Sequence, residues 1–241
     1  MIRAVLFDLD DTLVDHQYAS RAALAGVRER FPAFQKHELD DLIAENQRIL
    51  DSIHHDVAMG ARDVADARIE RYRRLFAYVG HPDARAGAAA ELHRRVYQAN
   101  RRCVEGALEL MTLLRARLRV AVVTNNTVAE QTEKLATFGF APMVDALVTS
   151  EEIGAAKPDP RIFRAALERL SCDAHEAVMI GDAWHQDIVG ATGAGIRALW
   201  LNRNALPHPD SSVAMQIRAL HPAEDVAALV APDYALLNRL V

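Results

Sequence analysis

Three short apolar runs, each ending abruptly in polar residues, constrain the fold of this chain more than any other feature of its sequence. They span residues 2–7, 120–123 and 177–180. The polar residues that come next are Asp8, Thr124 and, after a glycine, Asp182. Such runs are typical of strands buried in a parallel sheet, and their polar ends indicate loops at the carboxyl ends of the strands. Residues 146–148 and 196–200 are weaker strand candidates.

Helical signals lie between these predicted strands. Thr127 and Glu130 have the spacing of a capping box, and the helical pattern that follows them stops at Gly139. Asp159 followed by Pro160 predicts the start of another helix. Strands that alternate with helices after residue 104 favour an α/β fold, a Rossmann-like parallel sheet covered by helices.

Residues 18–103 differ from the rest of the chain because they contain no convincing strand pattern. Instead they show long helical stretches near residues 37–53, 62–79 and 83–102. This segment predicts an all-helical domain inserted after the first strand. The predicted domains are therefore a sheet domain of residues 1–17 and 104–241, and a helical domain of residues 18–103.

Composition excludes several classes of protein. Of the 241 residues 51% are hydrophobic and 25% are charged, which is a globular balance and excludes global disorder. The net charge of −5 includes no block of like charges, so no nucleic-acid partner is expected. Nothing in the pattern indicates an oligomeric state.

Cysteine usage and hydropathy suggest the cellular compartment. Cys103 and Cys172 form no metal-type pair, and a chain of this length needs no disulfide framework, which favours a reducing cytoplasm. The first apolar run is too short for a signal-peptide core. No run approaches the roughly 18 apolar residues of a membrane span, so we expect a cytoplasmic protein with no membrane partner.

Acidic residues gather where a parallel sheet binds its ligands, outside the carboxyl ends of the strands. Asp8 and Asp10 stand two residues apart, so that one carboxylate can attack a substrate while the other transfers protons. Asp182 and Asp187 add hard oxygen ligands, which suit Mg²⁺. Asp187 also lies near a predicted helix start, where a carboxylate can simply complement the helix dipole, and both interpretations stay open.

Thr124, Asn125 and Lys157 offer a hydroxyl, an amide and a cation at the same sheet edge. If Asp10 is protonated, one Mg²⁺ and Lys157 together neutralise the three remaining carboxylates. A phosphate dianion can then bind such a site without net repulsion.

At this point the chain resembles the haloacid dehalogenase superfamily, whose four motifs occur in order. They are Asp8-Leu9-Asp10-Asp11-Thr12 for DxDx[TV], Thr124 after the second strand, Lys157-Pro158, and Gly181-Asp182 through Asp187 for GDxxxxD. Residues 18–103 are similar to the C1-type cap of this family. Residues 68–76 and 196–203 look most like the branch with nucleotide and acylneuraminate-9-phosphate phosphatases. Gln186 departs from the Asn of many relatives but leaves the carboxylates intact.

The resemblance implies a Mg²⁺-dependent phosphatase that hydrolyses a phosphoric monoester. Asp8 would attack phosphorus to form an aspartyl-phosphate, and Asp10 would protonate the leaving oxygen and then activate water. The implied metal ligands are Asp8, the backbone carbonyl of Asp10, Asp182 and Asp187, and the implied phosphate-binding residues are Thr124, Asn125 and Lys157. A cap of 86 residues that closes over a small molecule favours a small phosphorylated metabolite as substrate, such as a nucleoside monophosphate or an acyl-sugar phosphate.

Three alternatives stay open at this stage. A haloacid dehalogenase needs neither a metal nor a leaving-group acid, so Asp10 and Asp182 argue against it. A phosphomutase of the same superfamily would return the phosphoryl group to a sugar. In a non-enzymatic receiver domain the phosphorylated aspartate lies on a middle strand rather than on the first strand of the chain. An inserted cap of 86 residues would have no role in such a domain.

Overall fold

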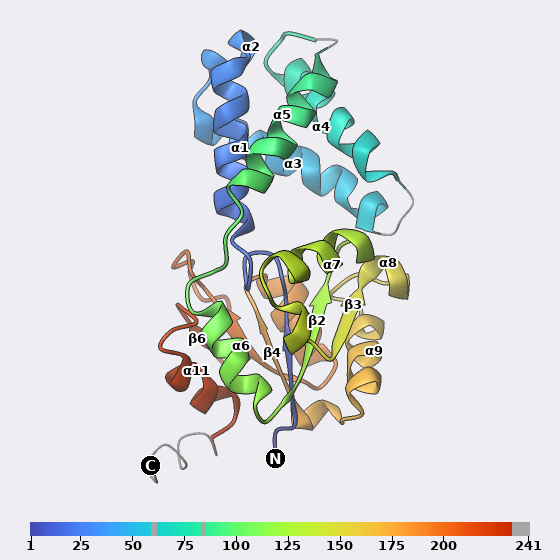
Figure 1. Cartoon of the computed structure of the whole chain (residues 1–241), viewed down its shortest axis with the longest axis vertical. Helices are drawn as coiled ribbons and strands as arrows, with labels where there is room; N and C mark the ends of the chain where they lie inside the picture. Colours follow the sequence, from blue (N-terminus) through green and yellow to red (C-terminus); the bar gives the residue numbers. More distant parts are fainter. Residues whose placement is uncertain (59–61, 83–84, 233–241) are drawn as a thin grey trace. The chain divides into compact units, whose positions relative to one another are not determined.

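A computed structural model of the protein describes residues 1–58, 62–82 and 85–232. The chain divides into two compact units (Figure 1). The sheet unit comprises Met1–Val14 and Cys103–Val241, and the helical unit comprises Asp15–Arg102. The structural junctions thus follow Val14 and Arg102, where the sequence predicted them after residues 17 and 103. That the helical unit acts as a cap stays a prediction.

The sheet unit is built on six parallel strands in the order β3-β2-β1-β4-β5-β6. They are β1 Ala4–Phe7, β2 Arg119–Thr124, β3 Ala146–Thr149, β4 Ala177–Gly181, β5 Arg197–Leu201 and β6 Met215–Ile217. The predicted α/β fold and its five predicted strands are confirmed. Strand β6 was missed because three residues at a sheet edge show too little hydrophobic pattern to be recognised.

Strand register brings the polar residues together. Phe7 of β1 lies opposite Val122 of β2 and Ile180 of β4. The Asp8 N–H continues the ladder by donating to the Ile180 carbonyl at 3.0 Å. The residues that follow β1, β2 and β4 therefore share one edge of the sheet.

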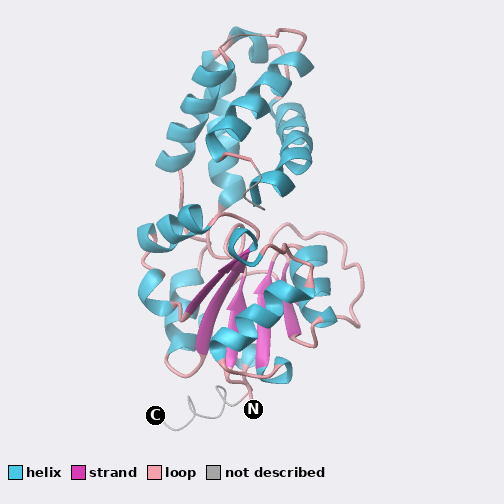
Figure 2. Cartoon of the chain, turned by 90° about the vertical axis from the view of Figure 1, so that its right-hand side faces the viewer, coloured by secondary structure: helices cyan, strands magenta, loops and turns pink. Residues whose placement is uncertain are grey.

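Helices cover both faces of this sheet (Figure 2). Val5 and Phe7 pack on one face with α6 (Ala107–Arg115) and α11 (Ala223–Val230). Leu6 packs on the other face with α9 (Pro160–Leu170) and α10 (Gly190–Gly193). Each such buried large side chain contributes about 1.5–3 kcal/mol relative to exposure, so β1 is held rigidly behind Asp8. The remaining short elements are α7 Val128–Thr137, α8 Ser150–Ile153, η1 Ala141–Met143, η2 Ala174–Glu176 and η3 Trp184–Val189.

The predicted helix ends are confirmed. Thr127 caps α7 by accepting from the Glu130 N–H at 3.4 Å, and Gly139 beyond its end has a φ of +75°. Asp159 caps α9 by accepting from the Arg161 N–H at 2.9 Å. These caps fix where the helices beside the site begin and end.

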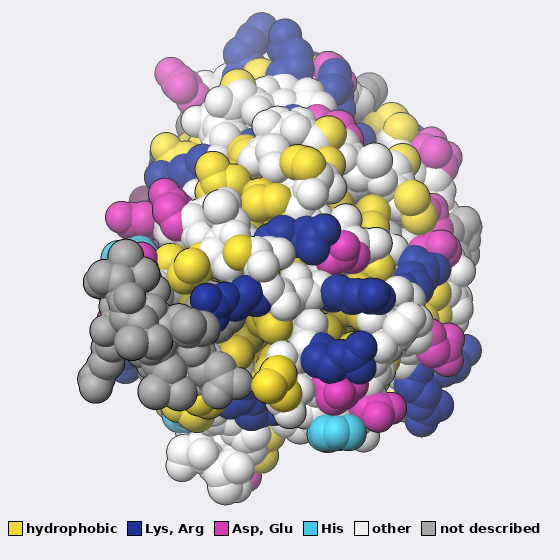
Figure 3. All heavy atoms as spheres, turned by 60° about the horizontal axis from the view of Figure 1, so that its bottom comes forward, with side chains coloured by type: hydrophobic (Ala, Val, Ile, Leu, Met, Phe, Trp, Pro, Cys, Tyr) yellow, Lys and Arg dark blue, Asp and Glu magenta, His cyan; other side chains and the backbone are white. Residues whose placement is uncertain are grey.

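The amino ends of the strands carry arginines with structural partners. Arg3 pairs with Glu176 at 3.1 Å, Arg119 donates to the Leu170 carbonyl at 3.0 Å, and Arg197 donates to the Val230 carbonyl. Figure 3 shows that Lys and Arg side chains seen from this side are interspersed with acidic and hydrophobic ones. The arginines at the amino ends of the strands therefore link neighbouring elements by ion pairs and hydrogen bonds. The acidic motifs lie at the carboxyl ends of the strands.

The helical unit contains five helices in its described residues. They are α1 His16–Arg30, α2 Pro32–Gln35, α3 Leu39–Ala58, α4 Val64–Tyr78 and α5 Ala86–Ala99. Its own core includes Phe34 and Phe76, whose ring centroids are 4.6 Å apart. The three predicted helical stretches correspond to α3, α4 and α5, and residues 83–84 of the third stretch lie outside the described residues. In the part of the chain that the structure describes, no helix is both long and apolar enough to cross a membrane.

Candidate active site

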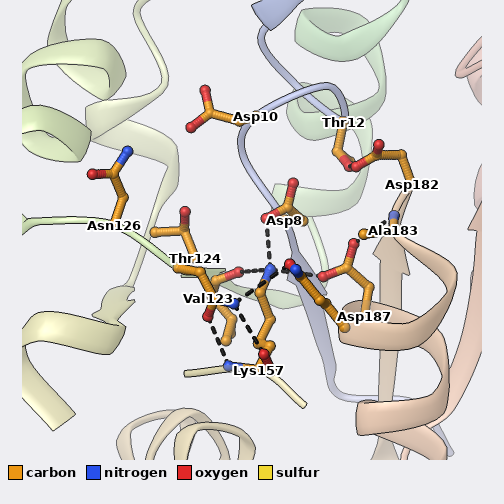
Figure 4. A network of polar contacts seen from close by, with 12 residues as sticks. Asp8, Asp10, Thr12, Val123, Thr124, Asn126, Lys157, Asp182, Ala183 and Asp187 are labelled. Carbon is orange, nitrogen blue, oxygen red and sulfur yellow. Dashed lines mark hydrogen bonds and ion pairs between the residues drawn. The ribbon is translucent and has the colours of Figure 1, made fainter. Parts of the chain in front are cut away.

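Asp8 stands at the carboxyl end of β1 with its carboxylate largely buried (Figure 4). Only 7% of the residue is exposed, and its Oδ1 accepts a hydrogen bond from Lys157 Nζ at 2.6 Å. A carboxylate at a rigid strand tip, with one oxygen oriented by a cation, is suited to nucleophilic attack from its other oxygen.

Lys157 is the buried cation at the centre of the site. Its Nζ donates to Asp8 Oδ1 at 2.6 Å, to Asp187 Oδ1 at 2.7 Å and to the Val123 carbonyl at 2.8 Å, which uses all three of its hydrogens. Burial alone would lower the pKa of Lys157, but the carboxylates of Asp187 and Asp8 raise it above its ordinary value. Lys157 therefore stays charged.

The side chain of Asn125 holds the Lys157 backbone in place. Its Oδ1 accepts from the Lys157 N–H at 2.7 Å, and its Nδ2 donates to the Lys157 carbonyl at 3.0 Å. The same Nδ2 lies 3.4 Å from Oε1 of Gln186. The structure thus shows Asn125 orienting the lysine loop, while its predicted contact with phosphate stays a prediction.

Three carboxylates meet beside Lys157. Oxygen atoms of Asp8, Asp182 and Asp187 all lie within 4.8 Å of one another. Burial raises the pKa of Asp8 to about 7, with Lys157 opposing this shift and Asp187 adding to it. Burial, together with the charges of Asp8 and Asp187, also raises the pKa of Asp182 well above its ordinary value. A hard divalent cation would relieve this repulsion, so the donor set fits Mg²⁺.

Asp182 is oriented by two further contacts. Its Oδ1 accepts from the Thr12 hydroxyl at 3.3 Å, and its backbone carbonyl accepts from Trp200 Nε1 at 2.7 Å. The Trp200 ring packs edge-on against Trp184 at 5.1 Å. Aromatic packing therefore supports the loop that carries this carboxylate.

Asp187 is fully buried in the first turn of η3, a π-helical segment. Its Oδ1 binds Lys157, and its Oδ2 accepts from the Ala183 N–H at 3.0 Å. The structure therefore gives Asp187 a structural role at this turn and a second role in holding Lys157. Direct contact of Asp187 with a metal stays a prediction.

Gly181 is required by the close approach of Asp187. A Cβ at this position would lie 2.5 Å from both Cβ and Cγ of Asp187. We expect Gly181→Ala to displace Asp187 from Lys157 and to lower the free energy of unfolding by about 1–3 kcal/mol, measured by thermal denaturation. Gly87→Ala is the matched control, since a Cβ there would meet no described atom within 4 Å beyond its chain neighbours and the backbone of its own helix, and Ala favours a helix. An unchanged Tm for Gly181→Ala would contradict this packing.

Asp10 lies apart from the three clustered carboxylates and points away from Asp182 (Figure 4). Both of its oxygens are bound by Lys134 Nζ, at 2.7 and 2.8 Å, and Oδ2 also accepts from Gln131 Nε2 at 3.1 Å. Gln131 and Lys134 belong to α7, and the sequence analysis missed both. The sequence pattern could have indicated both residues. The helix that starts just after Thr124 places them on the same buried face as Leu135.

Thr124 ends β2 beside this group. Its Oγ1 accepts from Gln131 Nε2 at 2.8 Å, which leaves the hydroxyl hydrogen to be donated elsewhere. The structure thus joins Thr124 to Asp10 through one amide. All seven predicted site residues lie at one edge of the sheet, in two groups around Lys157 and Lys134.

The geometry agrees with comparison to known proteins. The profile of the haloacid dehalogenase-like hydrolase family matches residues 2–195. The chain belongs to this family. The match includes every predicted site residue and confirms both the resemblance and the assignment of the chain as a hydrolase.

Named relatives of this chain include several phosphatases. Phosphoserine phosphatase of Thermus thermophilus is 32% identical over 238 residues, which cover 90% of this chain and 95% of the relative. Human N-acylneuraminate-9-phosphatase is 27% identical over 236 residues, which cover 91% and 93%. The crystal structure of the HAD-hydrolase YfnB of Bacillus subtilis, bound to magnesium, is 25% identical with a TM-score of 0.73, and the match covers 95% of this chain and 99% of that one.

Proposed function

We propose that this hydrolase is a Mg²⁺-dependent phosphatase that cleaves a small phosphate monoester through an aspartyl-phosphate. The observation that carries the proposal is the buried Lys157, which binds Asp8 while Asp182 and Asp187 stand beside it. This arrangement offers a nucleophile, a fixed cation and a set of oxygen ligands within one small volume. Phosphatase names among the relatives support the hydrolysis of a phosphate ester.

In the first half of the proposed reaction an Asp8 oxygen attacks phosphorus. The bond from phosphorus to the ester oxygen breaks, and that oxygen leaves with a proton from Asp10. Thr124 donates its hydroxyl hydrogen to a phosphoryl oxygen, and Lys157 offsets the charge on Asp8. Positioning and charge compensation of this kind supply most of the catalysis in phosphoryl transfer.

In the second half a water molecule attacks the aspartyl-phosphate. Asp10, now a carboxylate, takes the proton of this water while the bond from phosphorus to Asp8 breaks. Phosphate leaves, and Asp8 is again a carboxylate. The same side chain thus acts as acid and then as base.

Asp8, Asp182 and the backbone carbonyl of Asp10 would hold Mg²⁺, with Asp187 beside them. When bound, the ion supplies two positive charges that let the phosphate dianion approach Asp8. Together with Lys157, the ion would neutralise the carboxylates of Asp8, Asp182 and Asp187. Lys134 neutralises Asp10 when Asp10 is ionised, so the site still carries no net charge.

A panel of phosphate esters tests the proposed function. The panel contains phosphoserine, nucleoside monophosphates, an acylated sugar phosphate, a phosphopeptide and a 5′-phosphorylated oligonucleotide, with a 2-haloacid for the dehalogenase alternative. We expect phosphate release from one or more of the small esters, with the highest kcat/KM in that group. Halide release, transfer to a sugar, or a stable phosphoprotein without turnover would contradict the proposal.

Metal removal gives a second test. We expect EDTA to abolish phosphate release and Mg²⁺ to restore it, since Asp8 and phosphate otherwise repel each other. Because the pKa of Asp8 is raised to about 7 by burial, protons compete with the metal below that pH. The Mg²⁺ concentration for half-maximal activity should therefore rise as the pH is lowered from about 8 to about 6. Full activity in EDTA would contradict the metal assignment.

A further inference from the structure

The two buried lysines of this chain each hold one aspartate of the first motif. The sequence contains three lysines, Lys36, Lys134 and Lys157. Lys157 is 4% exposed and binds Asp8, while Lys134 is 1% exposed and binds Asp10. The role of Lys157 follows from its place beside the nucleophile. In the mechanism described above Lys134 only balances the charge of Asp10 and has no role in either step.

Lys134 holds Asp10 with a specific geometry. Its Nζ lies 2.7 and 2.8 Å from the two oxygens of the same carboxylate, so the cation spans both. Gln131, one turn earlier on α7, adds a bond to Asp10 Oδ2 at 3.1 Å and one to Thr124 Oγ1 at 2.8 Å. The donors of α7 therefore fix the orientation of Asp10 relative to Thr124.

The burial of the Gln131 amide is energetically unfavourable. The residue is fully buried, and its Oε1 has no hydrogen-bond partner among the described residues. An unsatisfied buried oxygen disfavours the folded state. Because packing alone would favour an apolar residue here, the amide is better explained by its contacts with Asp10 and Thr124.

We propose that Lys134 is a positioning residue for the second half of the reaction, the hydrolysis of the aspartyl-phosphate. This inference rests on the proposed function. In that half the oxygen of water bonds to phosphorus, the bond from phosphorus to Asp8 breaks, and the water proton passes to the Asp10 carboxylate. A cation within hydrogen-bond distance of both oxygens fixes the plane of the Asp10 carboxylate, and only the carboxylate form, which acts in this half, can accept at both oxygens.

The first half makes the opposite demand on Asp10, because the leaving oxygen needs a proton from it. Lys134 gives no help to that step. With 4-nitrophenyl phosphate the leaving group departs without a proton, so the first half becomes independent of Asp10. This substrate therefore isolates the step that Lys134 serves.

Rapid-quench kinetics of Lys134→Met with 4-nitrophenyl phosphate test the proposal. We expect a burst of about one nitrophenolate per site, followed by a steady-state rate lowered about 10–100-fold, a part of the 10²–10⁴-fold that a general base contributes. KM should fall together with kcat, and kcat/KM should stay near that of the wild type, because it reports only the steps up to the aspartyl-phosphate. Acid-quenched protein should carry phosphate.

Two further variants serve as controls. Lys134→Arg keeps the charge and should restore turnover at least in part, with little phosphoprotein. Lys36→Met removes an exposed lysine of the helical unit and should leave all rates unchanged. If Lys134→Met does not fold, Lys134→Gln is measured in its place.

A fall in kcat/KM equal to the fall in kcat, or the absence of phosphoprotein, would overturn the proposal. Failure of both the Met and the Gln variants to fold would also overturn it, since Lys134 would then be a structural residue. The proposed function fails in a different way, through a wild-type protein that releases no phosphate from any ester of the panel. The two failures are therefore distinguishable.

Discussion

Replacing Asp8 by asparagine is expected to lower kcat at least about 1000-fold, which corresponds to roughly 4 kcal/mol of transition-state stabilisation. An amide oxygen is a poor nucleophile toward phosphorus and a poor ligand for a divalent cation. The neighbouring carboxylate of Asp187 offers no replacement, because it is engaged with Lys157 at 2.7 Å. The measurement is phosphate release under saturating substrate and Mg²⁺.

The same variant should fold at least as well as the wild type. Burial raises the pKa of Asp8, which means that its charge disfavours the folded state of the chain alone. The amide of Asp8→Asn would keep an oxygen for Lys157 without that charge. Loss of activity with an unchanged or higher Tm would thus separate a catalytic role from a structural one.

Asp41→Asn is a matched control on an exposed position of α3. It makes the same chemical change outside the sheet unit and should leave kcat unchanged. Mass spectrometry of Asp8→Asn excludes reversion by deamidation. A folded, intact variant with a tenth or more of the wild-type activity would remove Asp8 from the nucleophile position.

The strands of the sheet, and the polar residues at their carboxyl ends, were predictable from local sequence patterns. A buried strand needs only a short apolar run, and residues 2–7 and 177–180 are such runs. In a parallel sheet every carboxyl end lies at the same edge, so Asp8 and Asp182 were expected there, and the pairing of β1 with β4 brings them together. A helix cap such as Thr127 is also predictable, because it depends only on residues close to it in sequence.

Contacts that depend on long-range packing were not predictable. The contact of Asn125 with phosphate stays a prediction, but no local pattern indicates that its amide also binds both backbone groups of Lys157, which is 32 residues away in sequence. A lysine in a helix is usually exposed, so its place on one face of α7 does not by itself show that Lys134 is buried, and only the packing of the sheet unit shows that it reaches Asp10. Local pattern predicts elements, whereas such pairs arise from how the elements pack.

The helical unit marks the limit of what sequence pattern can predict. Its helices follow from periodicity, and Phe34 and Phe76 in its core follow from ordinary packing. If this unit acts as the proposed cap, substrate choice would depend on its individual polar side chains, for which no periodic pattern exists. Two relatives that match most of this chain carry different substrate names, phosphoserine for one and N-acylneuraminate-9-phosphate for the other, so overall similarity does not identify the substrate.

Asp10→Asn is expected to lower kcat/KM about 10²–10⁴-fold for alkyl phosphates, because the leaving alkoxide then has no proton donor. For 4-nitrophenyl phosphate the loss in kcat/KM should be much smaller, since nitrophenolate leaves unprotonated. Its kcat should nevertheless stay low, because the second half still needs Asp10 as a base. The measurement compares both constants across a series of leaving groups.

The pattern of these losses distinguishes the role of Asp10 from mere support of the site. The amide of Asp10→Asn would keep an oxygen that can accept from Lys134, so the orientation of α7 should change little. If Asp10 only held Lys134 and Gln131 in place, kcat/KM would fall by the same factor for every leaving group. Losses that grow with the pKa of the leaving group are expected from an acid, and equal losses would show that Asp10 does not donate the proton.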